Sequence, residues 1–351
     1  SALVLAGCAS GSTDGGSSAS AYKAADCAAD STSDNTFKVG TLLPITGSLA
    51  FLGPPEIAGV GLAVADINAA GGVNGTDACL YSTDSGDSSD MSVSTASAED
   101  LIKQKVSFVL GAASSSVSLN VVDAITEAGI VQISPANTAA ALSGYSPFYF
   151  RTAPPDTVQG SALGQLITGD GNSKVAFLVF NDSYGTGLRD STEASIVEAG
   201  GSVVYGGTGK GQEFPPAQTT FSSEVTAALA TQPDALVVIA FDETKAIIPE
   251  LVAQGWDMAN TYFTDGNTGS FEKDFEAGTL EGAQGTIPGV VATDEIKKKF
   301  LEVNPDLTDF SYAAESYDAT ILVALAAIAG GKADGATIKA NLKAVSEGGV
   351  K

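Results

Sequence analysis

The stretch VSFVLGAASSSVSLNVVDAITEAGIVQISPA (106–136) contains two short apolar runs with a helical pattern between them. The runs VSFVLGA (106–112) and IVQISPA (130–136) are almost continuously apolar, as expected for strands that are covered on both faces. Between them, apolar residues recur at intervals of four until Gly129, which is typical of a helix that ends at a glycine. A strand, a helix and another strand in this order predict a unit of parallel sheet.

The same alternation extends along most of the chain. Six further short apolar runs predict strands: FKVGTLLP (37–44), CLYSTDS (79–85), KVAFLVFND (174–182), SVVYGG (202–207), DALVVIAF (234–241) and TYFTD (261–265). Helical patterns lie between and after these runs, at residues 57–72, 186–201, 244–255, 294–304, 311–331 and 334–346. Pro249 is expected to kink or break the helix that contains it.

The alternation occurs twice, and the proline-rich stretch RTAPPD (151–156) suits a crossover between the two runs. We therefore predict an α/β protein with two Rossmann-like lobes, each with a parallel central sheet, joined by a hinge. We assign residues 37–153 and 290–347 to the first lobe and residues 154–289 to the second. Ligands of such folds bind at the carboxyl ends of the strands, in the crevice between the lobes.

The N-terminal stretch SALVLAGCAS (1–10) is similar to the end of a bacterial lipoprotein signal peptide, with Cys8 at the lipidated position. The alternative is a chance cysteine among small residues. On the first interpretation, residues 1–7 are a remnant of the signal peptide. Residues 8–36, rich in Gly, Ser, Ala and Asp, then form a flexible tether between a lipid-anchored Cys8 and the folded part.

With Cys8 lipidated, Cys27 and Cys79 remain as a pair in an oxidising compartment. We expect a disulfide between them, the alternative being two unrelated thiols.

Composition excludes several classes of function. The net charge of −24 would repel a phosphate backbone, so we expect no nucleic-acid partner. The acidic residues are scattered, which favours a solvated surface over a cation-binding cluster. The sequence has no histidine and three cysteines, so it lacks the commonest general base and cannot form a Cys₄ zinc site. We expect neither a cofactor nor a bound metal.

The segment GAASSSVS (111–118) carries several hydroxyl groups directly after a predicted strand. A serine nucleophile needs a nearby base, and neither a histidine nor an S-x-x-K motif accompanies these serines. As the start of a helix, the segment instead offers unpaired N–H groups and hydroxyls that suit an anion such as a carboxylate. Spacing alone does not distinguish this from a simple helix cap by Ser114 or Ser115.

Five segments together resemble one family, the type I periplasmic binding proteins of branched-chain amino-acid ABC transporters. The similarity covers residues 37–331 in the same order. The segments are TLLPITGSLAFLGPPEIAGVGLAVADINAAGGVNG (41–75), VLGAASSSVS (109–118), VQISPANTAAALS (131–143), FYFRTAPPDTVQG (148–160) and NDSYGTGL (181–188). The resemblance implies two lobes joined by three crossovers that close on a small ligand.

The resemblance also implies roles for individual residues. Ser115 matches the serine that binds the ligand's α-carboxylate through its hydroxyl and N–H groups, and Ser114 lies beside it. Ala136 and Thr138 match the next loop, which meets the carboxylate and the ammonium group. Tyr184 matches the tyrosine of the second lobe that closes over the ligand. Asp265 falls where the family places an acid that pairs with the α-ammonium, although an aspartate before a glycine is more often a turn former.

The sequence departs from the family pattern where the ligand side chain would lie. Leu52, beside Phe51, stands where the family often has an aromatic pocket wall. Phe241, Asp242 and Glu243 stand where amino-acid binders can carry a tyrosine. The two acids could bind a second cationic or amide group, or face solvent. Because the family also includes proteins that bind urea, short amides and aromatic acids, the resemblance leaves the ligand's identity open.

These observations favour an extracytoplasmic lipoprotein, not an enzyme, that captures a branched-chain or other small amino acid or a related amide. The resemblance implies ABC permease subunits as partners, membrane contact through the lipid anchor only, and a monomer. A receptor of the same fold that signals to another partner is the alternative, and a serine hydrolase is disfavoured. Family members usually continue beyond the last predicted helix, so we expect the C-terminal part of the second lobe to be missing.

Overall fold

A computed structural model describes residues 26–27, 36–289 and 291–347. Two five-stranded sheets form the framework, with strand orders β2-β1-β3-β4-β5 and β10-β9-β8-β6-β7 and parallel pairing throughout. The strands are β1 (Lys38–Leu43), β2 (Cys79–Asp84), β3 (Phe108–Gly111), β4 (Val131–Ser134), β5 (Tyr149–Arg151), β6 (Lys174–Val179), β7 (Ser202–Tyr205), β8 (Ala235–Ile239), β9 (Thr261–Phe263) and β10 (Gln284–Gly285). The predicted class, α/β with two Rossmann-like halves, is confirmed.

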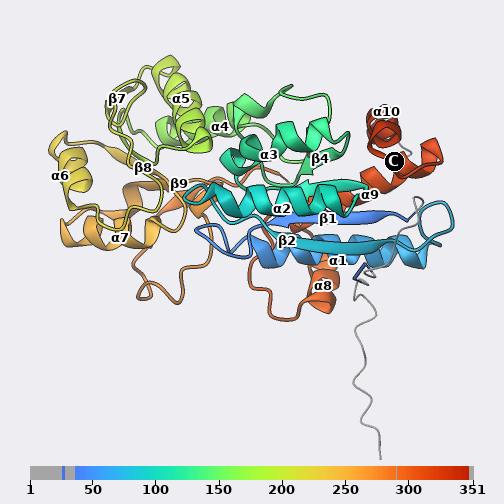
Figure 1. Ribbon diagram of the computed structural model, residues 1–351. Helices are drawn as coiled ribbons and strands as arrows, with labels where there is room; N and C mark the ends of the chain where they lie inside the picture. The colour runs from blue at the N-terminus through green and yellow to red at the C-terminus, as the bar shows by residue number, and fades with distance from the viewer. Residues whose placement is uncertain (1–25, 28–35, 290, 348–351) are drawn as a thin grey trace, which may run out of the picture.

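Helices alternate with these strands, and Figure 1 shows the two halves side by side. The α-helices are α1 (Gly53–Ala69), α2 (Met91–Lys103), α3 (Ser115–Glu127), α4 (Asp156–Gly169), α5 (Ser183–Glu198), α6 (Ser222–Ala230), α7 (Thr244–Ala253), α8 (Asp294–Val303), α9 (Ala313–Gly330) and α10 (Gly335–Ser346). Pro249 lies inside α7, which continues through it and does not break there. The short 3₁₀ helices are η1 (Ala140–Leu142), η2 (Met258–Asn260) and η3 (Asp265–Asn267).

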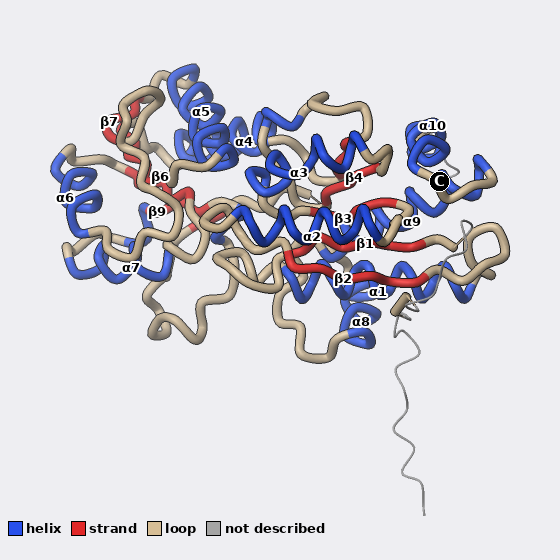
Figure 2. Tube along the Cα trace, viewed as in Figure 1, coloured by secondary structure: helices blue, strands red, loops and turns tan. Residues whose placement is uncertain are grey.

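All eight predicted strands are present: the inner strands β1, β3, β4, β6, β8 and β9 are buried on both faces, and the edge strands β2 and β7 are partly exposed. In the first sheet, α1, α9 and α10 cover one face, where Val39 and Phe108 pack against Val64 and Val323. On the other face, α2 and α3 cover the sheet. Helices α4 and α5 lie on one side of the second sheet and α6 and α7 on the other (Figure 2). Residues of these strands and helices form one continuous core.

Helix α9 is long and apolar enough to cross a membrane by length and composition alone, but half of it is buried in the protein. It packs closely against α1: a Cβ atom on Gly59 would lie 2.1 Å from the carbonyl oxygen of Ala313. Only glycine allows this approach, and the contact makes α9 a core helix of the first half of the molecule.

The predicted disulfide between Cys27 and Cys79 is present, with a Cα–Cα distance of 4.8 Å. The Cys27 N–H also donates to the Leu80 carbonyl at 2.9 Å, so the segment lies along the start of β2. Cys8 and the proposed signal-peptide remnant lie outside the described residues, as does most of the predicted tether.

The chain crosses from the first half to the second between β5 and α4, within the proline-rich stretch 152–155. It returns between β10 and α8, and α8 packs against α1. The Thr152 hydroxyl donates to the Glu315 carbonyl at 3.0 Å, so the outgoing segment also contacts α9. These connections place the carboxyl ends of both sheets across from one another.

Candidate ligand-binding site

The loop between β3 and α3 offers donors to the space between the halves. A Cβ atom on Gly111 would lie 2.1 Å from the Leu42 carbonyl oxygen, and its φ of +122° also requires glycine. Donors from the β4 region hold three successive carbonyls, that of Gly111 at the end of β3 and those of Ala112 and Ala113 in the loop. These bonds are Gln132 Nε2 to Gly111 O (2.9 Å), Ser134 Oγ to Ala112 O (2.7 Å) and Asn137 Nδ2 to Ala113 O (2.7 Å).

Because those carbonyls are engaged, the loop presents mainly N–H and hydroxyl groups to the cleft. Ser114 caps α3, since its Oγ accepts from the Val117 N–H at 3.4 Å. The Ser115 hydroxyl is buried and accepts from the Ala139 N–H at 3.3 Å. The first amides of a helix have no partner within it and carry the positive end of its dipole, so this end of α3 favours an anion.

The loop after β4 brings a second hydroxyl to the same place. Thr138 is 1% exposed, and its Oγ1 has no hydrogen-bond partner among the described residues. A buried polar group without a partner is destabilising unless a ligand or a water satisfies it. The hydroxyl of Thr138 is therefore available to a bound molecule.

The second half of the molecule contributes a buried acid, Asp265, at the end of β9. Three side chains hold its carboxylate: Tyr184 OH at 2.6 Å and Gln159 Nε2 at 2.9 Å from Oδ1, and Tyr312 OH at 2.7 Å from Oδ2. Burial raises the pKa of Asp265, and these hydrogen bonds lower it in part. A carboxylate has about four acceptor positions, so one remains for a donor from a ligand.

A second buried carboxyl, Asp156, lies near Asp265 at the first residue of α4. Its backbone N–H donates to the Thr138 carbonyl at 2.7 Å, while neither carboxylate oxygen has a hydrogen-bond partner among the described residues. Burial, and next the charge of Asp265, raise the pKa of Asp156 to about 8; the nearby Thr138 hydroxyl, which lies outside hydrogen-bonding geometry, and the charge of Arg151 lower it in part. Asp265 therefore supplies the acceptor for a cation on this side of the cleft, while Asp156 is mostly protonated below about pH 8.

Side chains of both halves line one small pocket with a cavity volume of about 10 Å³, which we call the inner pocket. The halves also touch directly beside it, since the Ser183 N–H of α5 donates to the Ser116 hydroxyl of α3 at 3.2 Å. The ring of Tyr184 stacks on that of Phe241, with centroids 5.7 Å apart. The cleft is therefore closed over a pocket with donors at one end and an acid at the other.

The inner pocket brings together eight of the ten predicted ligand-binding residues. From the first half these are Leu52, Ser114, Ser115, Ala136 and Thr138, and from the second half Tyr184, Phe241 and Asp265. Phe51 lines an adjoining pocket instead. Asp242 lines neither pocket; its carboxylate is exposed and pairs with Lys245 at 3.1 Å.

Sequence reasoning missed Tyr312, Asp156 and Gln159. Tyr312 precedes α9 with a left-handed φ of +59°. In the sequence, Tyr312 is a tyrosine at the start of a strong helical pattern, and nothing about that position marks it as a binding residue. Asp156 and Gln159 occupy one face of the first turn of α4, at a spacing of three residues that could have marked them as a pair.

The described residues contain no group of three or more side chains suited to holding a metal ion. Among the serines, the hydroxyls of Ser114 and Ser115 accept hydrogen bonds from backbone amides, as expected for capping and binding groups. The chemistry that this arrangement offers is the binding of a small molecule with a negative and a positive end.

Comparisons with known proteins agree with this geometry. A family profile described as periplasmic binding protein matches residues 36–350. The Leucine-, isoleucine-, valine-, threonine-, and alanine-binding protein of Pseudomonas aeruginosa is 31% identical over 171 residues, which is 47% of this chain and 44% of that protein. Leu/Ile/Val-binding protein homolog 2 of Brucella abortus is 34% identical over 164 residues, 46% and 44% of the two chains. The match thus spans about half the length of these curated relatives.

Solved structures extend the comparison to most of the chain. The branched-chain amino acid transporter substrate binding protein LivJ of Streptococcus pneumoniae, in complex with isoleucine, superposes with a TM-score of 0.74 at 27% identity. That superposition covers 88% of this chain and 87% of the other. The leucine binding protein LivK of Thermotoga maritima gives a TM-score of 0.76 at 22% identity, with the same coverage, and supports the fold.

Proposed function

Because this chain belongs to the periplasmic binding protein family, we propose that it captures an α-amino acid between its two lobes and delivers it to an ABC importer. The family consists of solute-binding proteins rather than enzymes, and membership implies a location outside the cytoplasm. The amino acids proposed are branched-chain or other small ones, or related amides. The lobe boundaries and ligand-binding residues predicted from the sequence are part of this proposal.

The observation that carries the proposal is the opposite polarity of the two ends of the inner pocket. The α-carboxylate would bind the amides at the start of α3, with Ser115, and the unpartnered hydroxyl of Thr138. The α-ammonium would bind the remaining acceptor position of Asp265. Since the first group belongs to one lobe and the second to the other, a zwitterion contacts both and favours the closed form.

Closure would be reinforced by direct hydrogen bonds between the two lobes. Tyr312, at the start of α9, donates to Asp265 of the second lobe, and Ser116 accepts from Ser183. These contacts exist only when the lobes lie together, so they add to the free energy that the ligand supplies. Anchoring through Cys8 and docking to permease subunits complete the proposal.

The test is a thermal-unfolding screen of ligand-free protein against leucine, isoleucine, valine, alanine, short amides and aromatic acids. A ligand at 100 times its Kd should stabilise the folded protein by about 2.7 kcal/mol. Ser115→Ala and Thr138→Val should each weaken leucine binding, because each removes a donor to the carboxylate. If no amino acid or amide stabilises the protein, or if both variants bind leucine as the unmodified protein does, the proposal is wrong.

A further inference from the structure

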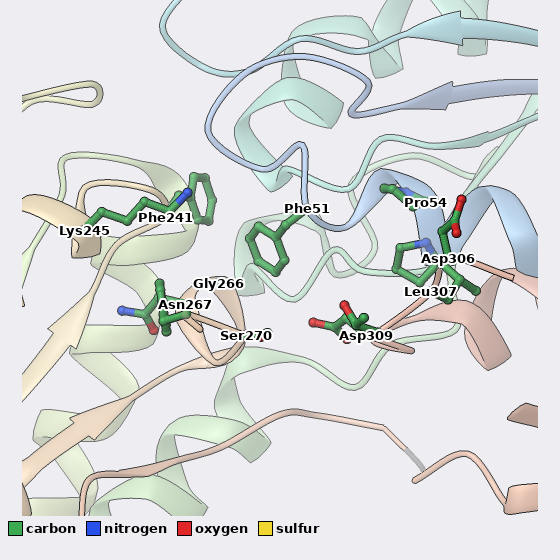
Figure 3. A pocket seen from close by; sticks show the side chains of 14 residues that line it. Phe51, Pro54, Phe241, Lys245, Gly266, Asn267, Ser270, Asp306, Leu307 and Asp309 are labelled. Carbon is green, nitrogen blue, oxygen red and sulfur yellow. The ribbon is translucent and has the colours of Figure 1, made fainter. Parts of the chain in front are cut away.

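A second pocket adjoins the inner pocket and is larger, with a cavity volume of about 230 Å³. We call it the outer pocket and define it by Phe51, Pro55, Phe241, Phe271 and Leu307. In Figure 3, Phe51 projects between Phe241 on one side and Leu307 on the other. The outer pocket therefore lies between the two lobes, at the mouth of the cleft.

The two pockets share a wall. Phe241 and Gly266 line both of them. A Cβ atom on Gly266 would lie 2.8 Å from the ring of Phe241, so a larger residue would not fit unless this ring moved. The absence of a side chain at this position keeps the shared wall thin. A molecule held in the inner pocket by its charged end thus has the outer pocket directly beside it.

The outer pocket is lined mainly by apolar groups; two of its charged residues, Lys245 and Asp309, have partners, and the third, Asp306, is exposed to solvent. Lys245 pairs with Asp242 at 3.1 Å and with Asp274 at 3.6 Å. The Asp309 carboxylate accepts from the Ser311 N–H at 2.7 Å. The lining rings are those of Phe51, Phe241 and Phe271. Aromatic surfaces of this kind favour an apolar group, and a ring can pack edge-to-face or offset against them.

Given the proposed function, on which this inference rests, we propose that the outer pocket receives the far end of the ligand's side chain. The ligands then include α-amino acids with side chains longer than that of leucine, aromatic ones among them. Their carboxylate and ammonium groups occupy the inner pocket at Ser115 and Asp265. Leu49, Leu52 and Tyr312 line other parts of the inner pocket, and a long side chain that extends past Phe241 and Gly266 enters the outer pocket.

The test is a substitution that fills the outer pocket and leaves unchanged the residues proposed to bind the ligand's carboxylate and ammonium groups. A Cβ atom on Gly269 would lie at ordinary contact distance, 3.5 Å from the ring of Phe51 and 3.7 Å from Asp309 Oδ2, and the backbone there is not left-handed. Gly269→Leu therefore places a side chain in the outer pocket. The matched control is Gly169→Leu, at the end of α4, where a Cβ atom meets nothing within 4 Å.

The measurement is calorimetric titration of ligand-free protein with L-alanine, L-leucine and L-phenylalanine. We expect the unmodified protein to bind phenylalanine at least as tightly as leucine. Gly269→Leu should weaken phenylalanine binding by a factor of ten or more and alanine binding by less than two, while Gly169→Leu should change neither. Retained alanine binding shows that the variant is folded. Phe51→Ala, which opens the pocket instead, should also weaken phenylalanine binding more than alanine binding.

Different results separate the two proposals. If leucine or alanine binds and phenylalanine does not, or if Gly269→Leu and Phe51→Ala affect all three ligands equally, the outer pocket does not hold the side chain, although the proposed function stands. If none of the three binds the unmodified protein, the proposed amino-acid function fails, and the inference fails with it.

Discussion

The replacement Asp265→Asn removes one charge from the inner pocket and little else. Asparagine has the shape of aspartate, its oxygen can still accept from Gln159 and Tyr184, and its amide can donate to the hydroxyl of Tyr312. Because burial raises the pKa of Asp265, the neutral side chain should be tolerated by the fold. The variant therefore reports on the charge that faces the ligand.

The magnitude follows from the burial of the pair. Two unit charges about 4 Å apart attract by about 4 kcal/mol at an effective dielectric constant of about 20. Removing one partner of a buried charge pair typically weakens binding by about 2–5 kcal/mol. At about 1.4 kcal/mol for each factor of ten, leucine affinity should fall about 30-fold to a few thousand-fold.

The assay is calorimetric titration with leucine at pH 7, on protein that has been unfolded and refolded to remove endogenous ligand. The control is Asp242→Asn, which removes an exposed acid of the same lobe that pairs with Lys245, and it should change leucine affinity by less than twofold. A three-fold or smaller loss in Asp265→Asn, with the fold intact, would refute the assignment of the ammonium to this carboxylate.

Three further predictions concern buried groups and the disulfide. Asp156 has a folded-state pKa of about 8, above its unfolded value, so between these two values the folded protein keeps a proton that the unfolded chain loses. The free energy of unfolding of the ligand-free protein should therefore fall between about pH 4 and pH 8, by at most about 1.4 kcal/mol per pH unit. Asp156→Asn should flatten this slope in urea unfolding, and an unchanged slope would contradict the assignment. The pKa of Glu56 is also raised, first by burial and next by the charge of Glu315. Its carboxylate oxygens have no hydrogen-bond partner among the described residues. Glu56→Gln should therefore raise the thermal midpoint more at pH 8 than at pH 5, and an effect that is the same at both pH values would contradict this. Replacing Cys27 and Cys79 by alanine releases a constraint across 52 residues, for which chain entropy gives at most about 4 kcal/mol. Leucine affinity should stay within twofold, because Cys79 begins β2 at the end of the sheet opposite the cleft, and a larger loss would show that the disulfide shapes the site.

The sequence predicts the framework well where burial is strong. The runs that became β1, β3, β6 and β8 are apolar on both faces, so their pattern is local and visible. Strands β5 and β10 have three and two residues, too few for a periodic signal. Helix α2 is built mainly from Ser, Ala and Thr, and its buried residues are Ser94, Ala98 and Leu101, which do not stand out as an apolar face.

The candidate site is predictable to the extent that it lies at strand ends. Ser115, Thr138 and Asp265 each follow a recognisable strand, and parallel sheets bring such ends to one edge. Gln159 and Tyr312 reach the same carboxylate from 106 and 47 residues away in sequence. No local pattern encodes those contacts, because the crossovers between the lobes determine them. The residues around Asp242 are compatible with either ligand binding or exposure to solvent; in the structure Asp242 is exposed and pairs with Lys245 at 3.1 Å.

The central claim is that the inner pocket recognises both charges of an α-amino acid. The most direct measurement compares L-leucine with 4-methylpentanoate, which lacks the ammonium group, and 3-methylbutylamine, which lacks the carboxylate. Calorimetric titration of the ligand-free protein should show leucine binding at least 100-fold more tightly than either analogue. Equal binding of leucine and 4-methylpentanoate would contradict the role of Asp265, and equal binding of leucine and 3-methylbutylamine would contradict the role of Ser115 and Thr138.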